Sequence, residues 1–149
     1  MKNKSQLNSI TLEKELKWFA EVLELRSAIN AASDKKVPQI TDATPPILDG
    51  DESNYAHFVA ENQLDYEERL VLILALIPHL RPELLDTFLQ KNESTQQTYT
   101  EFGGKRGKHH IGFLPTGETA AFILTNRDLE ARIKLMRIFE PNHIFRKQN

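Results

Sequence analysis

The fold of this chain is decided by an apolar run, LVLILALI, at Leu70–Ile77. Asp65 precedes the run and Glu68 follows Asp65 by three residues, which is the spacing of a capping box at the start of a helix. Because the run is apolar on every side of a helix, we expect it to be buried all round. The sequence therefore predicts a helix that begins after Asp65 and lies at the centre of a domain.

A short second helix is predicted to follow the central one. Pro78 could stop or bend the central helix, and Pro82 suits the first turn of a helix at Glu83–Gln90. A buried helix, a turn bounded by prolines and a short second helix are typical of the first half of a helix-turn-helix unit. The predicted fold class is therefore mainly α: a compact multi-helix domain with a helix-turn-helix or winged-helix-like core and at most a small β element.

The N-terminal region predicts a long amphipathic helix from an N-cap at Thr11 to about Ala32. Its apolar residues recur every three or four positions and form one stripe. Trp18 widens the stripe, and we expect it to be buried in the core, with a groove for a partner as the alternative. The stripe comprises Leu12, Leu16, Phe19, Val22, Leu23 and Ile29.

Residues 33–52 break the helical pattern, because three prolines and a glycine fall within them. We expect a linker, or a strap that lies across the surface. The predicted organisation is an N-terminal region at 1–52 and a helical, winged-helix-like domain at 53–149 whose first helix is capped by Ser53. A single folded unit that also includes residues 1–32 is the alternative.

The composition excludes several classes of protein. The chain has 149 residues, a net charge of −2 and no cysteine, with 40% apolar and 27% charged residues. There is no overall field to hold nucleic acid or an anionic membrane, and no disulfide, thiolate metal site or cysteine nucleophile. The longest apolar run falls far short of the ~20 residues that span a bilayer, and the N-terminus lacks an apolar leader. We expect a cytoplasmic protein without membrane contact.

A glycine-rich segment, Gly103–Thr119, contains five of the six glycines, three cations and two adjacent histidines. Thr98–Phe102, just before it, alternates weakly and could form a short strand. Thr116 is predicted to cap a helix at Gly117–Leu124, and a further helix is expected to start at Thr125 and end at Pro141. One face of that last helix carries Leu129, Ile133, Met136 and Phe139.

The glycine-rich segment does not match a nucleotide-binding loop. A phosphate loop needs Gly, four residues, then Gly-Lys-Ser/Thr, and both Gly104-Lys105 and Gly107-Lys108 lack the first glycine and the hydroxyl. No Gly-x-Gly-x-x-Gly occurs. His109 and His110 are adjacent and so unsuited to a shared metal, and Asp49–Glu52 lacks the later glycine and glutamate of a calcium loop. We therefore expect no catalytic residue, metal or cofactor.

The same segment is the candidate binding site. Its cations could contact phosphates, although no aromatic platform is interleaved with them, and a solvated or packing loop is a simpler reading. We expect recognition of protein before nucleic acid. The candidate binding residues are Lys105, Arg106, Lys108, His109, His110, Thr116 and Glu118.

Two blocks of the sequence together resemble a known family. The stretch 66–86, together with Phe102-Gly103-Gly104, Gly107-Lys108 and the stretch 112–119, looks like the N-terminal region of certain bacterial AAA+ ATPases. In that family a winged-helix-like domain precedes the ATPase module, and members occur with bacterial contractile injection systems. The resemblance covers roughly Tyr55 to Phe145.

The resemblance implies a non-catalytic accessory domain that recognises a protein partner or substrate and that could oligomerise through its parent ATPase. The Walker motifs, sensor residues and arginine finger have no counterpart in these residues, so ATP hydrolysis is not assigned to them. The resemblance also implies that the sequence is a fragment and that strands after Asn149 complete the winged helix. Two alternatives remain open: a stand-alone nucleic-acid-binding winged-helix module, and a structural oligomerisation domain built on the Leu12–Ile29 stripe.

Overall fold

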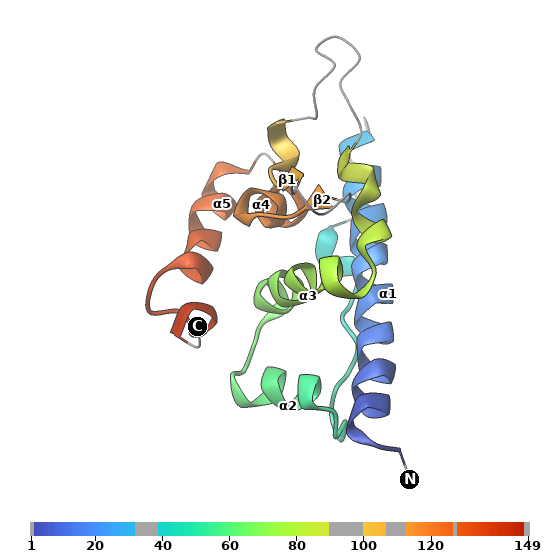
Figure 1. Ribbon diagram of the computed structural model, residues 1–149. Helices are drawn as coiled ribbons and strands as arrows, with labels where there is room; N and C mark the ends of the chain where they lie inside the picture. Colours follow the sequence, from blue (N-terminus) through green and yellow to red (C-terminus); the bar gives the residue numbers. More distant parts are fainter. Residues whose placement is uncertain (1, 32–38, 90–99, 107–112, 127, 148–149) are drawn as a thin grey trace. The chain divides into compact units, whose positions relative to one another are not determined.

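The computed structural model describes residues 2–31, 39–89, 100–106, 113–126 and 128–147. The chain forms two compact units, Met1–Ile73 and Leu74–Asn149 (Figure 1). The described residues are mainly helical, with one small antiparallel strand pair, which confirms the predicted fold class at the level of mainly α. The winged-helix core stays a prediction.

The first unit is built on α1, Lys4–Ala31, which starts earlier than predicted. Asn3 and Gln6 form its capping box: the Gln6 N–H donates to Asn3 Oδ1 at 2.8 Å, and the Asn3 N–H donates to Gln6 Oε1 at 2.9 Å. The prediction of Thr11 as N-cap is wrong. Thr11 lies inside the helix and is buried, and its hydroxyl contacts Leu7 O and Asp51 rather than a free backbone amide.

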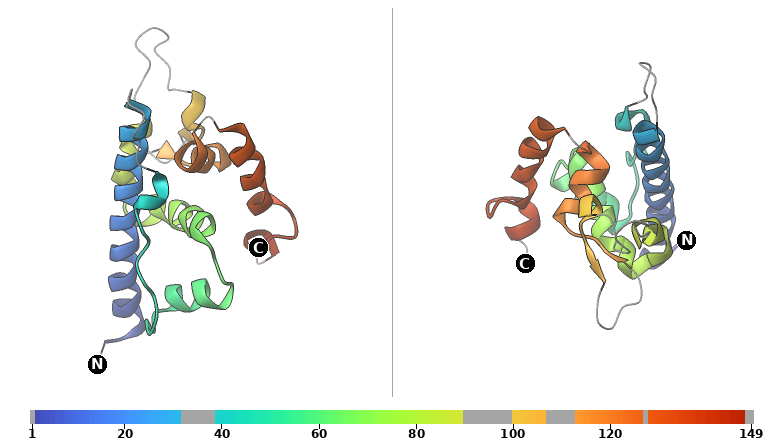
Figure 2. Two further views of the ribbon diagram at one scale, coloured as in Figure 1. Left: turned by 180° about the vertical axis from the view of Figure 1, so that it is seen from behind. Right: turned by 90° about the horizontal axis from the view of Figure 1, so that it is seen from above.

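Residues 39–53 form a strap that runs beside this helix (Figures 1 and 2). It contains a short 3-10 helix, η1, at Ile40–Asp42. The Trp18 indole N–H donates to Ala43 O at 2.9 Å, and the Tyr66 hydroxyl lies 2.9 Å from Ile40 O and 3.0 Å from Ala43 O. Trp18 is 2% exposed and packs edge-on against the Tyr66 ring, so its predicted place in the core is confirmed.

Two helices follow the strap, and both begin directly after their predicted capping residues. The helix α2, Asn54–Glu61, is capped by Ser53, whose Oγ accepts from the Ala56 N–H at 3.0 Å. The helix α3, Tyr66–Leu80, begins after the predicted capping box, in which the Asp65 and Glu68 side chains each accept the other's backbone N–H. Local hydrogen bonding therefore sets both starting points.

The central helix α3 differs from its prediction in two respects. It is buried along one side only: Leu70, Ile73, Leu74 and Ile77 are buried, whereas Ala75 is exposed. Pro78 lies inside it and does not end it: the proline itself donates no helical hydrogen bond, but the Arg81 N–H still donates to Ile77 O at 2.8 Å. A continuous apolar run thus gives a helix with a covered and an uncovered side.

The second unit consists of short elements. After α3 come two 3-10 helices, η2 at Pro82–Leu89 and η3 at Thr100–Phe102, and two paired strands, β1 at Lys105–Arg106 and β2 at Phe113–Leu114. Pro82 opens η2, as predicted. The strand predicted at Thr98–Phe102 is wrong for residues 100–102, which are helical, and its first two residues lie outside the described part.

Three α-helices and a 3-10 helix complete this unit. They are α4 at Gly117–Thr125, α5 at Leu129–Leu135, η4 at Met136–Phe139 and α6 at Ile144–Lys147. Three aromatic rings, Phe88, Phe102 and Phe122, meet edge to face with centroids 5.1–6.4 Å apart. Among the described residues, no helix is long and apolar enough to cross a membrane.

Candidate functional site

The described residues of the predicted binding segment include two short paired strands just before α4, and we call Gly103, Gly104 and Thr116 at their base the hairpin neck. Gly103 and Gly104 have φ angles of +62° and +71°, a backbone conformation that favours glycine. The Gly104 N–H donates to Thr116 Oγ1 at 2.8 Å, and the Thr116 hydroxyl donates to Glu118 Oε2 at 2.8 Å. Thr116 is the N-cap of α4, which confirms the prediction, and its hydroxyl also accepts the Gly104 N–H at the hairpin neck.

Thr119 is the partner of Thr116 in the capping box at the start of α4. The hydroxyl of Thr119, fully buried, accepts the Thr116 N–H at 3.0 Å. A threonine three residues after an N-cap occupies the position of the Glu or Gln in a standard capping box. The spacing is visible in the sequence, but threonine is not the Glu or Gln that identifies a capping box from residue type.

The structure brings together only part of the predicted site. Thr116 and Glu118 contact each other, and Lys105 and Arg106 form β1, which pairs with β2 in the register Lys105–Leu114 and Arg106–Phe113. The remaining three predicted residues lie outside the described part of the chain. They are Lys108, His109 and His110.

The contact with Thr116 has an electrostatic consequence that can be tested. The hydrogen bond from the Thr116 hydroxyl holds the pKa of the Glu118 carboxyl below its usual value of 4.5. Thr116→Val keeps the shape and removes the hydroxyl, so the pKa of Glu118 is expected to rise toward 4.5 in an NMR pH titration. Thr125→Val, which removes a hydroxyl bonded to Ala121 O in the same helix, should leave Glu118 unchanged. Equal titration of Glu118 in all three proteins would contradict this contact.

A groove of about 340 Å³ lies between α4 and the α5–η4 segment. Its polar lining comes from Glu118 and Arg132, which have opposite charges. Gly117 lies against Phe139, since a Cβ at position 117 would approach the ring to 3.4 Å. The apolar lining comprises Gly117, Ala121, Leu135, Met136 and Phe139.

The outer face of α5 and η4 continues this groove as an exposed apolar stripe. Leu129 is 69% exposed, Ile133 60%, Met136 63% and Phe139 37%, whereas Leu135 and Ile138 of the same segment are buried. The four residues share one face, as the periodicity predicted. That face is exposed, although Phe139 at its end also lies against Gly117 of α4, and we call it the α5–η4 stripe.

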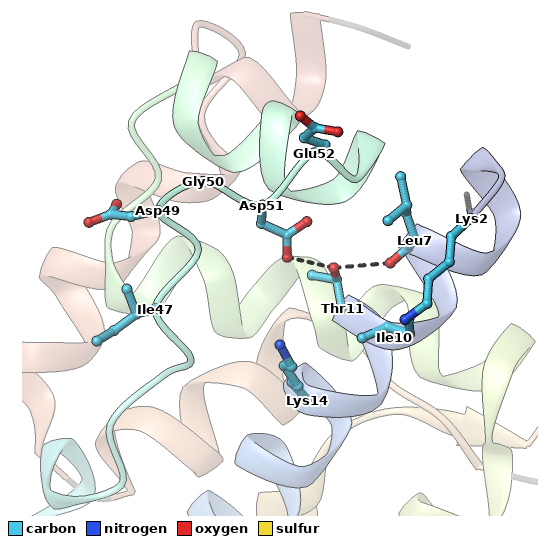
Figure 3. Close-up of a pocket in the computed structure, with 10 residues that line it drawn as sticks. All are labelled: Lys2, Leu7, Ile10, Thr11, Lys14, Ile47, Asp49, Gly50, Asp51 and Glu52. Atoms are coloured by element: carbon cyan, nitrogen blue, oxygen red, sulfur yellow. Dashed lines mark hydrogen bonds between the residues drawn. The ribbon is translucent and has the colours of Figure 1, made fainter.

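A second hollow, of about 370 Å³, lies in the first unit between α1 and the strap (Figure 3). Figure 3 shows Thr11 of α1 facing Asp51 of the strap, at 2.6 Å from hydroxyl to carboxylate. Partial burial raises the pKa of Asp51, but hydrogen bonds from Thr11 and Ser53 and the charge of Lys14 outweigh this effect and lower it. The carboxylate thus ties the strap to α1, and we assign this hollow a structural role.

A buried charged group also lies in the first unit. The Glu15 side chain is fully buried, and its Oε1 lies 2.5 Å from Arg69 Nη2, so it joins α1 to α3. Burial raises the pKa of Glu15, while the hydrogen bond and charge of Arg69 oppose the rise. Such a shift is common at active sites, but a closed, paired carboxylate has no access to a substrate. Among the described residues, no group of three or more His, Asp or Glu side chains could hold a metal ion.

Comparison with known proteins adds no relative to this description. No family model matches the chain, no curated protein matches its sequence, and no solved structure matches its fold.

Proposed function

We propose that this chain is a non-catalytic accessory domain of a bacterial AAA+ ATPase and that it recognises a protein partner in the cytoplasm. The observation that carries the recognition is the α5–η4 stripe, four large apolar side chains in line beside an apolar groove. Contiguous apolar surface of this kind marks interaction sites on folded proteins. The sequence resemblance to ATPases found with contractile injection systems supports the proposal that the parent protein is an AAA+ ATPase.

The chemistry of the stripe favours a protein over the other candidate ligands. The residues at 129, 133 and 136 have the spacing by which a helix presents side chains to a facing helix. The flanking charges include both signs, Glu130 and Arg132 among them, whereas a phosphate backbone selects cations. A small molecule would be held in an enclosed pocket, but here the groove opens onto the stripe.

A photo-cross-linking experiment tests the recognition. With p-benzoylphenylalanine in place of Met136, illumination of cells that express the chain is expected to yield a covalent adduct of one defined mass. Ile47 is the matched control, because it is 85% exposed but stands outside the stripe, in the strap. Identical adducts at Met136 and Ile47, or none at either, would remove the proposal of recognition at this face.

The encoding gene tests the parent protein separately. The reading frame is expected to continue past Asn149 into a Gly-x-x-x-x-Gly-Lys-Ser/Thr motif. A stop codon there would contradict the proposal that the parent protein is an ATPase, but it would not affect the proposal that the α5–η4 stripe recognises a protein. Salt-dependent DNA binding that disappears when Lys105, Arg106 and Lys108 are neutralised would instead favour the nucleic-acid-binding module.

A further inference from the structure

We propose that the partner seated on the α5–η4 stripe is a second copy of this chain, with the two α5–η4 segments packed antiparallel about a two-fold axis. This inference rests on the proposed recognition at the same face. It adds the identity and the orientation of the partner.

The four side chains of the stripe lie in line, so the stripe of one copy can pack along the stripe of another. In α5, positions 129 and 133 are one turn apart and share a face. In the 3-10 geometry of η4, side chains three apart eclipse one another, so Phe139 lies in line with Met136. In an antiparallel pair centred near Ile133, Leu129 of one copy therefore meets Met136 and Phe139 of the other. A two-fold interface requires such self-complementarity.

The charges along the segment favour this orientation. Asp128 and Glu130 lie at the N-terminal end of α5, and Lys134 and Arg137 lie toward the C-terminal end of the segment. Glu130 and Arg137 are seven residues apart and flank the stripe on one side. Antiparallel packing places Glu130 of each copy beside Arg137 of the other, whereas parallel packing would place like charges together.

The small size of the stripe indicates that the dimer is weak. Four side chains cover less than the ~800 Å² per partner of a standard stable interface. We therefore expect a weak dimer that dissociates reversibly on dilution. The ion pair within one copy, Glu130 with Lys134 at 3.2 Å, is exposed, so a contact across the interface can replace it at little cost.

Sedimentation of the complete chain from about 10 μM to 1 mM tests the dimer. The unchanged protein is expected to show a reversible monomer–dimer equilibrium. Ile133→Asp should weaken it at least tenfold, because a carboxylate would be buried against apolar side chains. Ile47→Asp, also at an exposed isoleucine, should leave it unchanged, and circular dichroism checks that both variants fold. A monomer throughout, or a dimer indifferent to Ile133→Asp, would overturn the proposal.

A charge-exchange experiment tests the orientation. Glu130→Lys and Arg137→Glu should each weaken self-association, because each places like charges together across the two-fold axis. An equimolar mixture of the two variants should associate again as a heterodimer, since both contacts then join opposite charges. Failure of the mixture to recover would overturn the antiparallel arrangement.

The cross-linking result separates this inference from the proposed function. An adduct at Met136 with twice the mass of the chain supports the second copy. An adduct with a different polypeptide, together with a monomer in sedimentation, rejects the second copy and keeps the proposed recognition. Absence of both the dimer and any adduct specific to Met136 rejects both.

Discussion

Replacing Arg69 by methionine is expected to lower the free energy of unfolding by about 3–5 kcal/mol at neutral pH, the usual loss when one partner of a buried ion pair is removed. The Arg69 guanidinium donates to Glu15 Oε1 at 2.5 Å and to Pro46 O at 3.1 Å, and it lies 5.6 Å from the centre of the Trp18 ring. Methionine fills much of the space but leaves the fully buried Glu15 carboxylate without its cation.

The loss is expected to depend on pH. Burial already raises the pKa of Glu15 above 4.5, and removal of Arg69 takes away its hydrogen bond and its charge, so that only the hydrogen bond from Tyr55 still opposes this rise. The folded variant then binds the Glu15 proton more tightly than the unfolded chain does. Its free energy of unfolding therefore falls as the pH rises from about 4.5 through the folded pKa. The effect of Arg69→Met should be larger at pH 8 than at pH 5.

Urea unfolding at these two pH values provides the measurement. The single tryptophan, Trp18, lies in the same unit as the pair, so its fluorescence reports the relevant transition. Adding Glu15→Gln to Arg69→Met removes the unpaired charge and should recover part of the loss at pH 8. Arg81→Met is the control, because the Arg81–Glu83 pair, at 4.0 Å, is solvent-exposed and contributes about 0–1 kcal/mol. Similar losses for Arg69→Met and Arg81→Met would show that the buried pair does not hold α1 to α3.

Gly103→Ala is expected to destabilise the second unit by about 2–5 kcal/mol. The φ angle of +62° alone costs about 1–2 kcal/mol for a residue with a Cβ. An added Cβ would also lie 2.5 Å from Glu118 Cβ and 2.9 Å from the Thr119 backbone nitrogen, and overpacking of this kind costs about 1–3 kcal/mol more. Because the obstacle includes helix backbone, no side-chain rotation can relieve it.

Gly50→Ala is the matched control for this substitution. Gly50 also has a positive φ, +77°, but an added Cβ would meet no atom within 4 Å. Gly50→Ala should therefore lower the free energy of unfolding only by the cost of the positive φ angle, about 1–2 kcal/mol. Thermal unfolding followed by circular dichroism compares the two variants, and equal losses would mean that the hairpin neck is not packed closely against α4.

The starts of helices could be predicted where a cap lies close in sequence. Ser53 and the Asp65–Glu68 pair were identified from residue type and spacing, and the structure confirms both. The start of α1 was misplaced, because Thr11 stands directly before an apolar residue while the weaker-looking Asn3–Gln6 pair makes the cap. Thr11 and the Asn3–Gln6 pair are both acceptable helix caps by residue type, and residue type alone does not show which of them starts α1.

The candidate site could be predicted only in part. Thr116 and Glu118 were singled out, and the structure joins them through one hydroxyl. The groove beside them was not foreseen, because it needs the α5–η4 segment to return to the start of α4. Periodicity placed Leu129, Ile133 and Met136 on one face, but it does not tell a face that packs inward from one that faces solvent.

The mainly helical class, several helix starts and the interruption at the prolines follow from residue type and spacing, because caps and prolines act on backbone groups only a few residues away. The burial of Glu15 with Arg69, the one-sided cover of Leu70–Ile77 and the exposure of the α5–η4 stripe arise from long-range packing. Whether a face is buried depends on which side chains from distant segments of the chain pack against it. The periodicity of that face carries no information about its neighbours.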